Sequence, residues 1–336
     1  MTTRSTPITV VGAGITGLWL ALLLARRGHR VHLIERSPET APFSGAASRY
    51  AGAMLAPDCE AESAPPLVRD LGRAALVLWR DVYPGLASSG SLVVASPRDR
   101  GELARFAALT ERHTTLDRKA LAALEPELAS RFDAALYFAG EAHMSAPAAL
   151  AFLLDAVRAA GARVSFGHDG PVAEVEGILI DCRGIAAAGR LPTLRGVRGE
   201  RVVVRAPDVA FSRPVRLLHP RVPLYVVPWP GHVYMIGATV IESDDDGPMT
   251  VRSALELLGA AYALHPGFAE AAILEMDAGV RPAFPDNIPR AFVSPDGRTI
   301  RVNGAYRHGF LLAPMLAQAV CDHLGGGSES PLLVWV

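Results

Sequence analysis

Three glycines near the start of the chain have a spacing that is typical of a phosphate-binding turn. Gly12, Gly14 and Gly17 follow a β-branched run at residues 8–11, and Glu35 lies eighteen residues after the last of them. The first glycine permits a tight turn, the second lets backbone N–H groups approach a diphosphate, and the third lets a helix pack closely on a sheet. A carboxylate after the next strand can accept hydrogen bonds from ribose hydroxyls. The spacing predicts a dinucleotide site but does not distinguish FAD from NAD.

A stretch rich in small residues follows between positions 44 and 57. Backbone without large side chains can pass close to a flat ligand, so we expect further cofactor contacts here, with a flexible loop as the alternative. Such contacts favour a cofactor that is bound in an extended form along the protein. The residues expected to make them are Ala46, Ala47, Ala51, Gly52, Ala53 and Met54.

The elements that must position this motif form a βαβ unit at the N-terminus. We expect strands at 8–11 and 30–35 with a helix at 18–27 between them, then an antiparallel sheet in the middle and a strand and helix near the end. This order predicts an α/β (α+β) chain in which a nucleotide-binding domain is interrupted by a second sheet. The expected nucleotide-binding domain comprises residues 1–85, 137–205 and 275–327, the second domain comprises 86–136 and 206–274, and 328–336 forms a loosely held tail.

Composition excludes several classes of protein. The chain has 336 residues, of which 50% are apolar and 20% charged, so a folded protein of two domains is expected. With 33 Lys and Arg against 34 Asp and Glu, the net charge of −1 gives no support to nucleic-acid binding. Cys59, Cys182 and Cys321 are widely spaced, which argues against disulfides or a metal site and favours a reducing cytoplasm.

One apolar run, at residues 8–25, has the length of a signal or membrane segment. The three glycines interrupt it in the pattern above, and no small-residue cleavage site follows. A nucleotide-binding strand and helix is the better interpretation, so we expect a protein without a membrane span.

Seven segments together resemble the flavin-dependent D-amino-acid oxidase family, and within it the glycine oxidases of thiamine biosynthesis. The similarity follows nearly the whole chain in order, and its last two motifs are the most specific. The segments are VVGAGITG at the start, AGAML in the small-residue stretch, VRGE at 197–200, LYVVP at 224–228, GATVIE at 237–242, GVRPAFPDN at 279–287 and YRHGFLLAP at 306–314.

The resemblance implies a fold and a reaction. The fold is a glutathione-reductase-type FAD-binding Rossmann domain with an inserted antiparallel-sheet substrate domain, and the FAD is noncovalent. The reaction is hydride transfer from the α-carbon of glycine or a small D- or N-methyl amino acid to flavin N5. Molecular oxygen reoxidises the flavin and gives H2O2, and the imine yields glyoxylate and ammonia or enters the thiazole branch of thiamine biosynthesis. Thiazole synthase is then a functional partner, and a homo-oligomer is possible.

The resemblance also implies roles for particular side chains. Arg281 matches the arginine that binds the substrate carboxylate, for which a planar guanidinium is suited. Tyr225 matches a tyrosine that lines the substrate site, and Arg307 is expected to face the substrate. Val240 stands where close relatives have methionine, so a larger substrate side chain is expected to fit. No general base is evident, because a deprotonated amino group can itself drive hydride departure.

Further flavin contacts follow from the same motifs. Backbone after residue 305 is expected to approach the pyrimidine end of the flavin, where the next helix N-terminus favours negative charge. His308 is counted among the cofactor residues of this segment, and a structural role is expected for it rather than a catalytic one. The remaining cofactor residues are Ile15, Thr16, Arg36, Val175, Tyr306, Arg307, Gly309, Phe310 and Leu311.

The sequence departs from the family at two places and leaves several alternatives open. After Val175 the chain lacks a short β-meander, and Cys182, Arg183 and Gly184 replace an alanine-rich turn. A D-amino-acid or sarcosine oxidase or dehydrogenase of the same fold remains possible. So do a nicotinamide-dependent Rossmann dehydrogenase and a non-catalytic flavin-binding protein.

Overall fold

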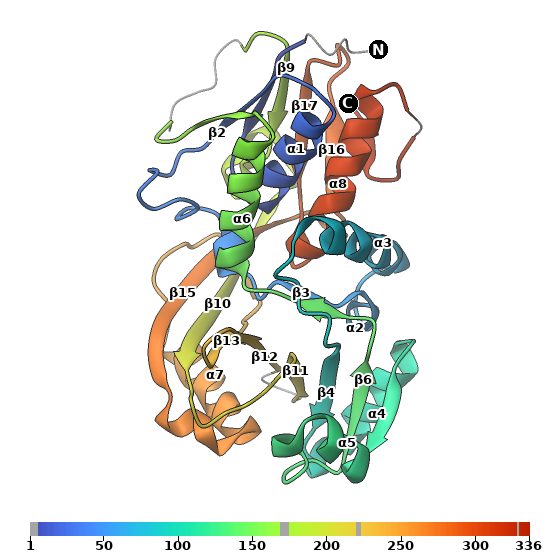
Figure 1. Cartoon of the computed structure of the whole chain (residues 1–336), viewed down its shortest axis with the longest axis vertical. Helices are drawn as coiled ribbons and strands as arrows, with labels where there is room; N and C mark the ends of the chain where they lie inside the picture. Colours follow the sequence, from blue (N-terminus) through green and yellow to red (C-terminus); the bar gives the residue numbers. More distant parts are fainter. Residues whose placement is uncertain (1–5, 169–174, 220–222, 328) are drawn as a thin grey trace.

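The computed structural model describes residues 6–168, 175–219, 223–327 and 329–336. Its strands form two large sheets, which lie in the upper and lower parts of Figure 1. A seven-stranded sheet holds the glycine motif, and a nine-stranded sheet forms most of the second part. A small third sheet of β3 (Met54–Leu55) and β7 (Ala142–His143) lies between them.

The seven-stranded sheet has the order β18-β16-β17-β9-β1-β2-β8. The five strands from β17 to β8 are parallel, and β16 and β18 run in the opposite direction at one edge. Its central strands are short and apolar, as expected for parallel strands that are covered on both faces. The bounds are β1 Ile8–Val11, β2 Val31–Ile34, β8 Arg163–Ser165, β9 Ile178–Asp181, β16 Arg290–Val293, β17 Thr299–Asn303 and β18 Leu333–Trp335.

Four helices build the core around this sheet. Helix α1 (Ile15–Arg26) is apolar almost all round, as expected for a buried helix, and it packs against α6 (Ala146–Ala159) and α8 (Gly309–Leu324). Helix α3 (Pro66–Val82) also packs against α8. The glycine motif is therefore held at the start of a buried helix.

Helix α8 has an internal proline whose effect is compensated by α3. Pro314 has no N–H and cannot donate to the carbonyl of Phe310, four residues earlier. The indole Nε1 of Trp79 donates to that carbonyl at 2.8 Å instead, and the Trp79 ring stacks on the Phe310 ring. The first turns of α8, which border the cavity described below, are thus fixed by a side chain of α3.

The nine-stranded sheet has the order β14-β10-β13-β12-β11-β4-β6-β5, and β15 pairs with β10. All its neighbouring strands are antiparallel except β4 and β11. Its bounds are β4 Ser91–Ala95, β5 Thr114–Asp117, β6 Ala134–Phe138, β10 Arg195–Arg205, β11 Val215–Leu218, β12 Leu224–Trp229, β13 Val233–Gly237, β14 Ile241–Glu242 and β15 Ala272–Ala283.

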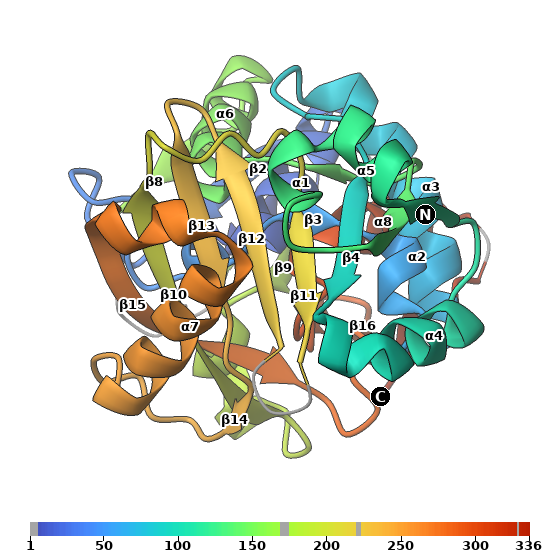
Figure 2. The same ribbon diagram turned by 90° about the horizontal axis from the view of Figure 1, so that it is seen from below.

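Three helices accompany this sheet, and Figure 2 shows α7 beside its central strands. Helix α5 (Arg118–Leu124) begins where the Asp117 carboxylate accepts a hydrogen bond from the N–H of Ala120, and α7 (Val251–Leu264) begins where the Thr250 hydroxyl accepts from Ser253. Helix α4 (Arg100–Leu109) packs on β4 and β6. A short helix, α2 (Pro57–Glu60), connects the small-residue stretch to α3.

Two details differ from the expected domain organisation. Strands β10 and β15 pair along almost their whole length, so residues 195–205 and 275–283 lie in the second sheet and not in the first. The tail was expected to be loose, which is wrong for β18: Leu333 is buried and the strand pairs with β16. The apolar side chains of Leu332 and Leu333 provide the reason, because they complete the core beside β16.

Within the described ranges, no helix is both long and apolar enough to cross a membrane. The same residues contain no group of three or more His, Cys, Asp or Glu side chains that could hold a metal ion.

Candidate active site

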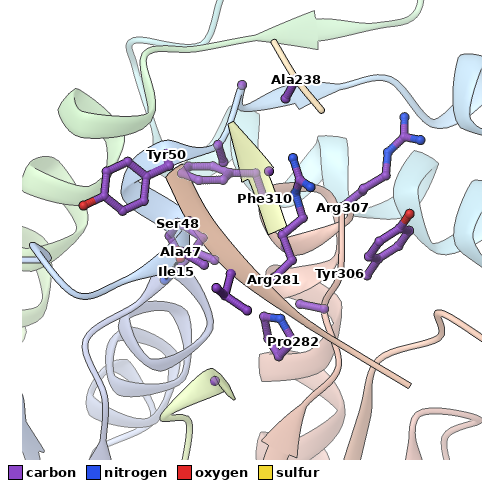
Figure 3. A pocket seen from close by; sticks show the side chains of 18 of the residues that line it. Ile15, Ala47, Ser48, Tyr50, Ala238, Arg281, Pro282, Tyr306, Arg307 and Phe310 are labelled. Atoms are coloured by element: carbon purple, nitrogen blue, oxygen red, sulfur yellow. Dashed lines mark hydrogen bonds between the residues drawn. The ribbon is translucent and has the colours of Figure 1, made fainter. Parts of the chain in front are cut away.

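A cavity of about 560 Å³ extends from the glycine motif to the second sheet. Its walls come from the ends of β1, β2 and β9, from the segment before α8, and from β12 and β15 of the second sheet. Figure 3 shows Arg281 and Arg307 projecting into this space, with Ile15 and Pro282 at its lower end. The cavity therefore joins the expected nucleotide site to the expected substrate site.

The glycine turn leaves no room for side chains. Gly12 has φ +98°, and a Cβ atom there would lie 2.7 Å from the carbonyl oxygen of Cys182. A Cβ atom on Gly17 would lie 1.9 Å from the carbonyl oxygen of Gly12, so α1 packs directly on the turn. Gly14 caps α1 without a side-chain hydrogen bond, which leaves this N-terminus facing the cavity. A close turn that leads into a helix N-terminus is the arrangement that binds a diphosphate.

Glu35 lines the cavity beside this turn, yet it is almost fully buried. Its Oε2 accepts from the N–H of Ala13 at 2.6 Å, and its Oε1 accepts from the N–H and hydroxyl of Ser37 at 2.9 and 2.8 Å. A carboxylate offers about four acceptor positions, so capacity for one further donor remains. These bonds fix the orientation of a carboxylate that could accept a further hydrogen bond from a ribose hydroxyl.

Ser48 is a cavity residue that sequence reasoning missed. Its hydroxyl accepts a hydrogen bond from the N–H of Ile15, the first residue of α1, at 3.0 Å. The 3-10 helix Ala47–Tyr50 places it there, so the small-residue stretch reaches the end of α1. No local capping signal could have revealed this contact, because the two residues lie 33 positions apart.

Most of the other expected cofactor residues line the same cavity, but four do not. Gly17 packs α1 on the turn, Leu311 lies in the core against Gly72, and His308 is buried beside Glu60. Val175 is half-buried and outside the cavity lining. The expected residues that line it are Gly12, Gly14, Ile15, Thr16, Glu35, Arg36, Ala46, Ala47, Ala51, Gly52, Ala53, Met54, Tyr306, Arg307, Gly309 and Phe310.

Arg281 reaches the cavity from β15, opposite Val197 of β10. Its Nη1 donates to the carbonyl of Thr239 at 3.1 Å. A Cβ atom on Gly199 would lie 2.0 Å from Nη2, so the VRGE motif provides the space that the guanidinium occupies. Desolvation lowers the pKa of Arg281, and the group remains a cation because arginine is not deprotonated in proteins.

Tyr225 meets Arg281 at this end of the cavity. It lies on β12, and its hydroxyl would be 3.0 Å from a Cβ atom on Gly237, its partner on β13. Its ring also lies against Gly52 of the small-residue stretch, where a Cβ atom would come within 2.8 Å. Glycines on both sides therefore let the ring stand between the second sheet and the nucleotide-binding part.

Glu60 links three basic side chains and was not identified from the sequence. Arg216 Nη2 donates to its Oε1 at 3.1 Å, Arg307 Nη2 lies 3.4 Å from the same oxygen, and His308 Nδ1 lies 3.5 Å from Oε2. Burial alone would raise the pKa of Glu60, but Arg307 and Arg216 outweigh this effect and lower it to about 2. Glu60 is thus a permanent anion that orients Arg307.

Val240 lies at the rim of the cavity and is 52% exposed. The turn before it is held by the VRGE motif, because the N–H of Glu200 donates to the Thr239 hydroxyl at 2.9 Å. Glu200 itself is buried and paired with Arg198 at 2.7 Å. VRGE is therefore a structural motif that places the residues around Arg281.

The residues present fit a flavin dinucleotide. A turn in which Gly12 and Gly17 leave no room for a Cβ atom, a helix N-terminus and the buried carboxylate of Glu35 lie together at one end of the cavity. The cavity then continues without interruption to Tyr225 and Arg281. A cofactor held at one end can thus face a carboxylate-bearing substrate at the other.

Comparisons with known proteins agree with this geometry. A family model, DAO, described as FAD dependent oxidoreductase, matches residues 7–323. A protein of Rhizobium etli that carries the name thiamine biosynthesis oxidoreductase ThiO is 52% identical over 318 residues, which cover 94% of this chain and 96% of that one. A glycine oxidase of Geobacillus kaustophilus is 29% identical over 352 residues, with 94% and 92% covered. The crystal structure of a glycine oxidase from Bacillus cereus has the same fold, with a TM-score of 0.82 at 21% identity over 97% of this chain and 96% of that one.

These findings confirm the resemblance, the mixed α/β fold class and the FAD cofactor that the sequence predicted. They rule against the nicotinamide-dependent alternative, because the matched family uses FAD. The roles of individual site residues stay predictions. The chain belongs to the DAO family of FAD dependent oxidoreductases.

Proposed function

We propose that this enzyme oxidises glycine or a small D- or N-methyl amino acid. The observation that carries the proposal is that Arg281 and Tyr225 both line the cavity that begins at the glycine turn. The named relatives, a glycine oxidase and a thiamine biosynthesis oxidoreductase, support the same substrate class. Molecular oxygen is the proposed final acceptor, so that amino acid, oxygen and water give the 2-oxo acid, H2O2 and an amine, which is ammonia for a primary amino acid and methylamine for an N-methyl amino acid.

Arg281 and Tyr225 bind and orient the substrate in this proposal. A guanidinium meets a carboxylate through two parallel N–H···O bonds, and the tyrosine hydroxyl donates a third. Holding the carboxylate fixes the position of the α-carbon. Such orientation of two reactants can lower the activation barrier by a large part. FAD, bound along the glycine turn and Glu35, supplies the acceptor for the hydride.

The cavity residues also indicate how the substrate amino group loses its proton. Glu60 is the carboxylate beside Arg307, and its pKa of about 2 makes it a poor base. The amino group is therefore expected to lose its proton to solvent before or on binding. This assigns orientation and exclusion of water to the protein, rather than proton transfer by a side chain.

The proposed place in metabolism follows from the relatives' names. We infer that the oxidised product feeds the thiazole branch of thiamine biosynthesis, with thiazole synthase as a functional partner. Cytoplasmic location is part of the same proposal, and the three cysteines, all free and buried, are compatible with it.

Replacing Arg281 tests this function. Arg281→Ala should lower kcat/KM for glycine and D-alanine by roughly thirty- to several-thousandfold, since losing a desolvated charge pair costs about 2–5 kcal/mol. An amine without a carboxylate should lose far less, because it never used the guanidinium. Flavin content serves as the control for folding. Equal oxidation of amino acids by the variant and the wild type would show that the carboxylate site lies elsewhere, with Arg307 as the next candidate.

A further inference from the structure

The cavity contains more positive charge than a monocarboxylate amino acid needs. Arg281, Arg307 and Arg216 line it together, and Glu60 is the carboxylate that contacts the last two. A substrate carboxylate would neutralise Arg281, and Glu60 neutralises one of the other two cations. One guanidinium charge is then left over in a partly buried site, which is unfavourable unless a ligand compensates it.

Arg216 is built into the substrate end of the cavity. It lies on β11 directly opposite Tyr225 of β12, so both side chains leave the same face of the sheet. Its guanidinium lies over the ring of Phe106, with 6.0 Å between Cζ and the ring centroid, and its side chain is 13% exposed. Arg216 therefore has a fixed position beside the proposed carboxylate site.

The other charged groups near Arg216 do not cancel this excess. Glu141 lies behind it, outside the cavity, where burial raises the pKa of its carboxyl to about 7 despite hydrogen bonds from Ser91 and Cys59. A raised pKa favours the neutral carboxyl, so Glu141 offsets less of the charge of Arg216 than an ordinary carboxylate would. His308 stays neutral there, because burial lowers its pKa.

Further charges stand at the cavity mouth. Glu62 and Glu102 both pair with Arg105, at 2.9 and 3.1 Å. Their side chains are 21% and 36% exposed, against 13% for Arg216, so solvent and salt screen them more than they screen Arg216.

We propose that Arg216, together with Arg307, recognises a second carboxylate, so that the enzyme accepts amino acids with an acidic side chain or an acidic N-substituent. This inference rests on the proposed function and names a substrate class within it. Glu60 positions the two guanidiniums, and Arg281 retains the α-carboxylate. Val240, exposed at the rim, leaves room for the larger substrate.

Pairs of substrates that differ only in charge test the proposal on the wild-type holoenzyme. D-aspartate is compared with D-asparagine, and D-glutamate with D-glutamine, by anaerobic flavin reduction and by oxygen uptake. A charge-assisted contact predicts that kcat/KM for at least one acid exceeds that for its amide by about tenfold or more. Equal or faster oxidation of both amides would overturn the inference.

Two variants locate the effect. Arg216→Gln should bring the ratio of acid to amide close to one, and its loss with the acid should exceed its loss with glycine by about tenfold. Arg213→Gln is the matched control, since Arg213 is 11% exposed, pairs with the buried Glu125 at 2.9 Å and does not line the cavity. It should keep the wild-type ratio. If Arg216→Gln does not retain FAD, Arg216→Lys is used in its place. The ratio of kcat/KM for acid to kcat/KM for amide in the wild type then still tests the inference.

The outcomes separate this inference from the proposed function. A wild type that oxidises glycine but discriminates against both acids refutes the second carboxylate site alone. If no amino acid reduces the flavin of the wild type, the proposed function and this inference are both refuted. An Arg216→Gln enzyme that loses the same factor with every substrate, together with a shifted flavin potential, would assign Arg216 to the cofactor instead.

Discussion

Gly199→Ala should disable the enzyme without removing any functional group. A Cβ atom at this position would lie 2.0 Å from Nη2, 2.2 Å from Cζ and 2.4 Å from Nη1 of Arg281. Ordinary contacts between heavy atoms are about 3.5–4.0 Å, so the guanidinium must retreat by roughly 1.5 Å. Misplacement by about 1 Å is enough to cost roughly a hundredfold in an oriented reaction. We therefore expect kcat/KM for glycine to fall about a hundredfold.

The free energy of unfolding of Gly199→Ala should stay near that of the wild type or rise slightly. Gly199 lies within β10, its φ is outside the left-handed region, and the clash is with the flexible end of a side chain. Alanine in a strand interior is favoured over glycine by roughly 0.5–1 kcal/mol, which offsets the displacement of Arg281. Thermal unfolding and FAD content should thus stay near those of the wild type while turnover is lost.

The assay is anaerobic stopped-flow reduction with glycine and with an amine that has no carboxylate. Gly259→Ala provides the control, since Gly259 lies in α7 and a Cβ atom added there would meet nothing within 4 Å. The control should reduce at the wild-type rate with both compounds. If Gly199→Ala oxidises glycine as fast as the wild type, the position of Arg281 does not govern the reaction and the proposed carboxylate site is wrong.

Three further predictions follow from buried polar contacts. Glu35→Ala should weaken FAD binding roughly ten- to a hundredfold for each hydrogen bond lost, with an unchanged substrate preference at saturating FAD, as measured by quenching of flavin fluorescence. Glu141 has a folded-state pKa of about 7 against 4.5 for the free group, so its contribution to stability is complete below pH 4.5 and is lost as the pH rises through 7. Glu141→Gln should remove this fall, worth about 2–4 kcal/mol, in urea titrations at pH 5 and pH 8. Trp79→Phe leaves the Phe310 carbonyl without its donor, because Pro314 cannot replace it, and should cost about 1–3 kcal/mol in the same titrations; unchanged midpoints would contradict either assignment.

The local elements could be predicted from the sequence because their signals are local. The strand at 8–11, the helix that follows it and the final helix all rest on apolar periodicity and glycine punctuation within a few residues. The motifs also identified the family, and the family in turn pointed to Arg281, Tyr225 and Arg307. The fold brings these three residues to one cavity. The motifs did not reveal which residues these side chains contact.

The missed residues depend on contacts between distant segments. Glu60 lies on a four-residue helix that follows the small-residue stretch, and its partners Arg216 and Arg307 are 156 and 247 positions away. Gly199 looked like one residue of a family motif, and only its register against β15 shows that it makes room for Arg281. The tail was misjudged because its few apolar residues gain their stability from β16 and not from their own sequence.

The paired strands β10 and β15 are anchored to the rest of the molecule next to the cavity. The carbonyl of Pro282 accepts a hydrogen bond from the N–H of Tyr306 at 2.8 Å, and this anchors the end of β15 to the segment before α8. Arg281 is adjacent to that anchor, whereas Tyr225 lies on β12, which reaches β10 only through β13. Any rocking of the second sheet about this anchor would move points in proportion to their distance from it. Such a motion would displace Arg281 less than the wall that β12 contributes, so the two sides of the cavity differ in how firmly they are tied to the segment before α8.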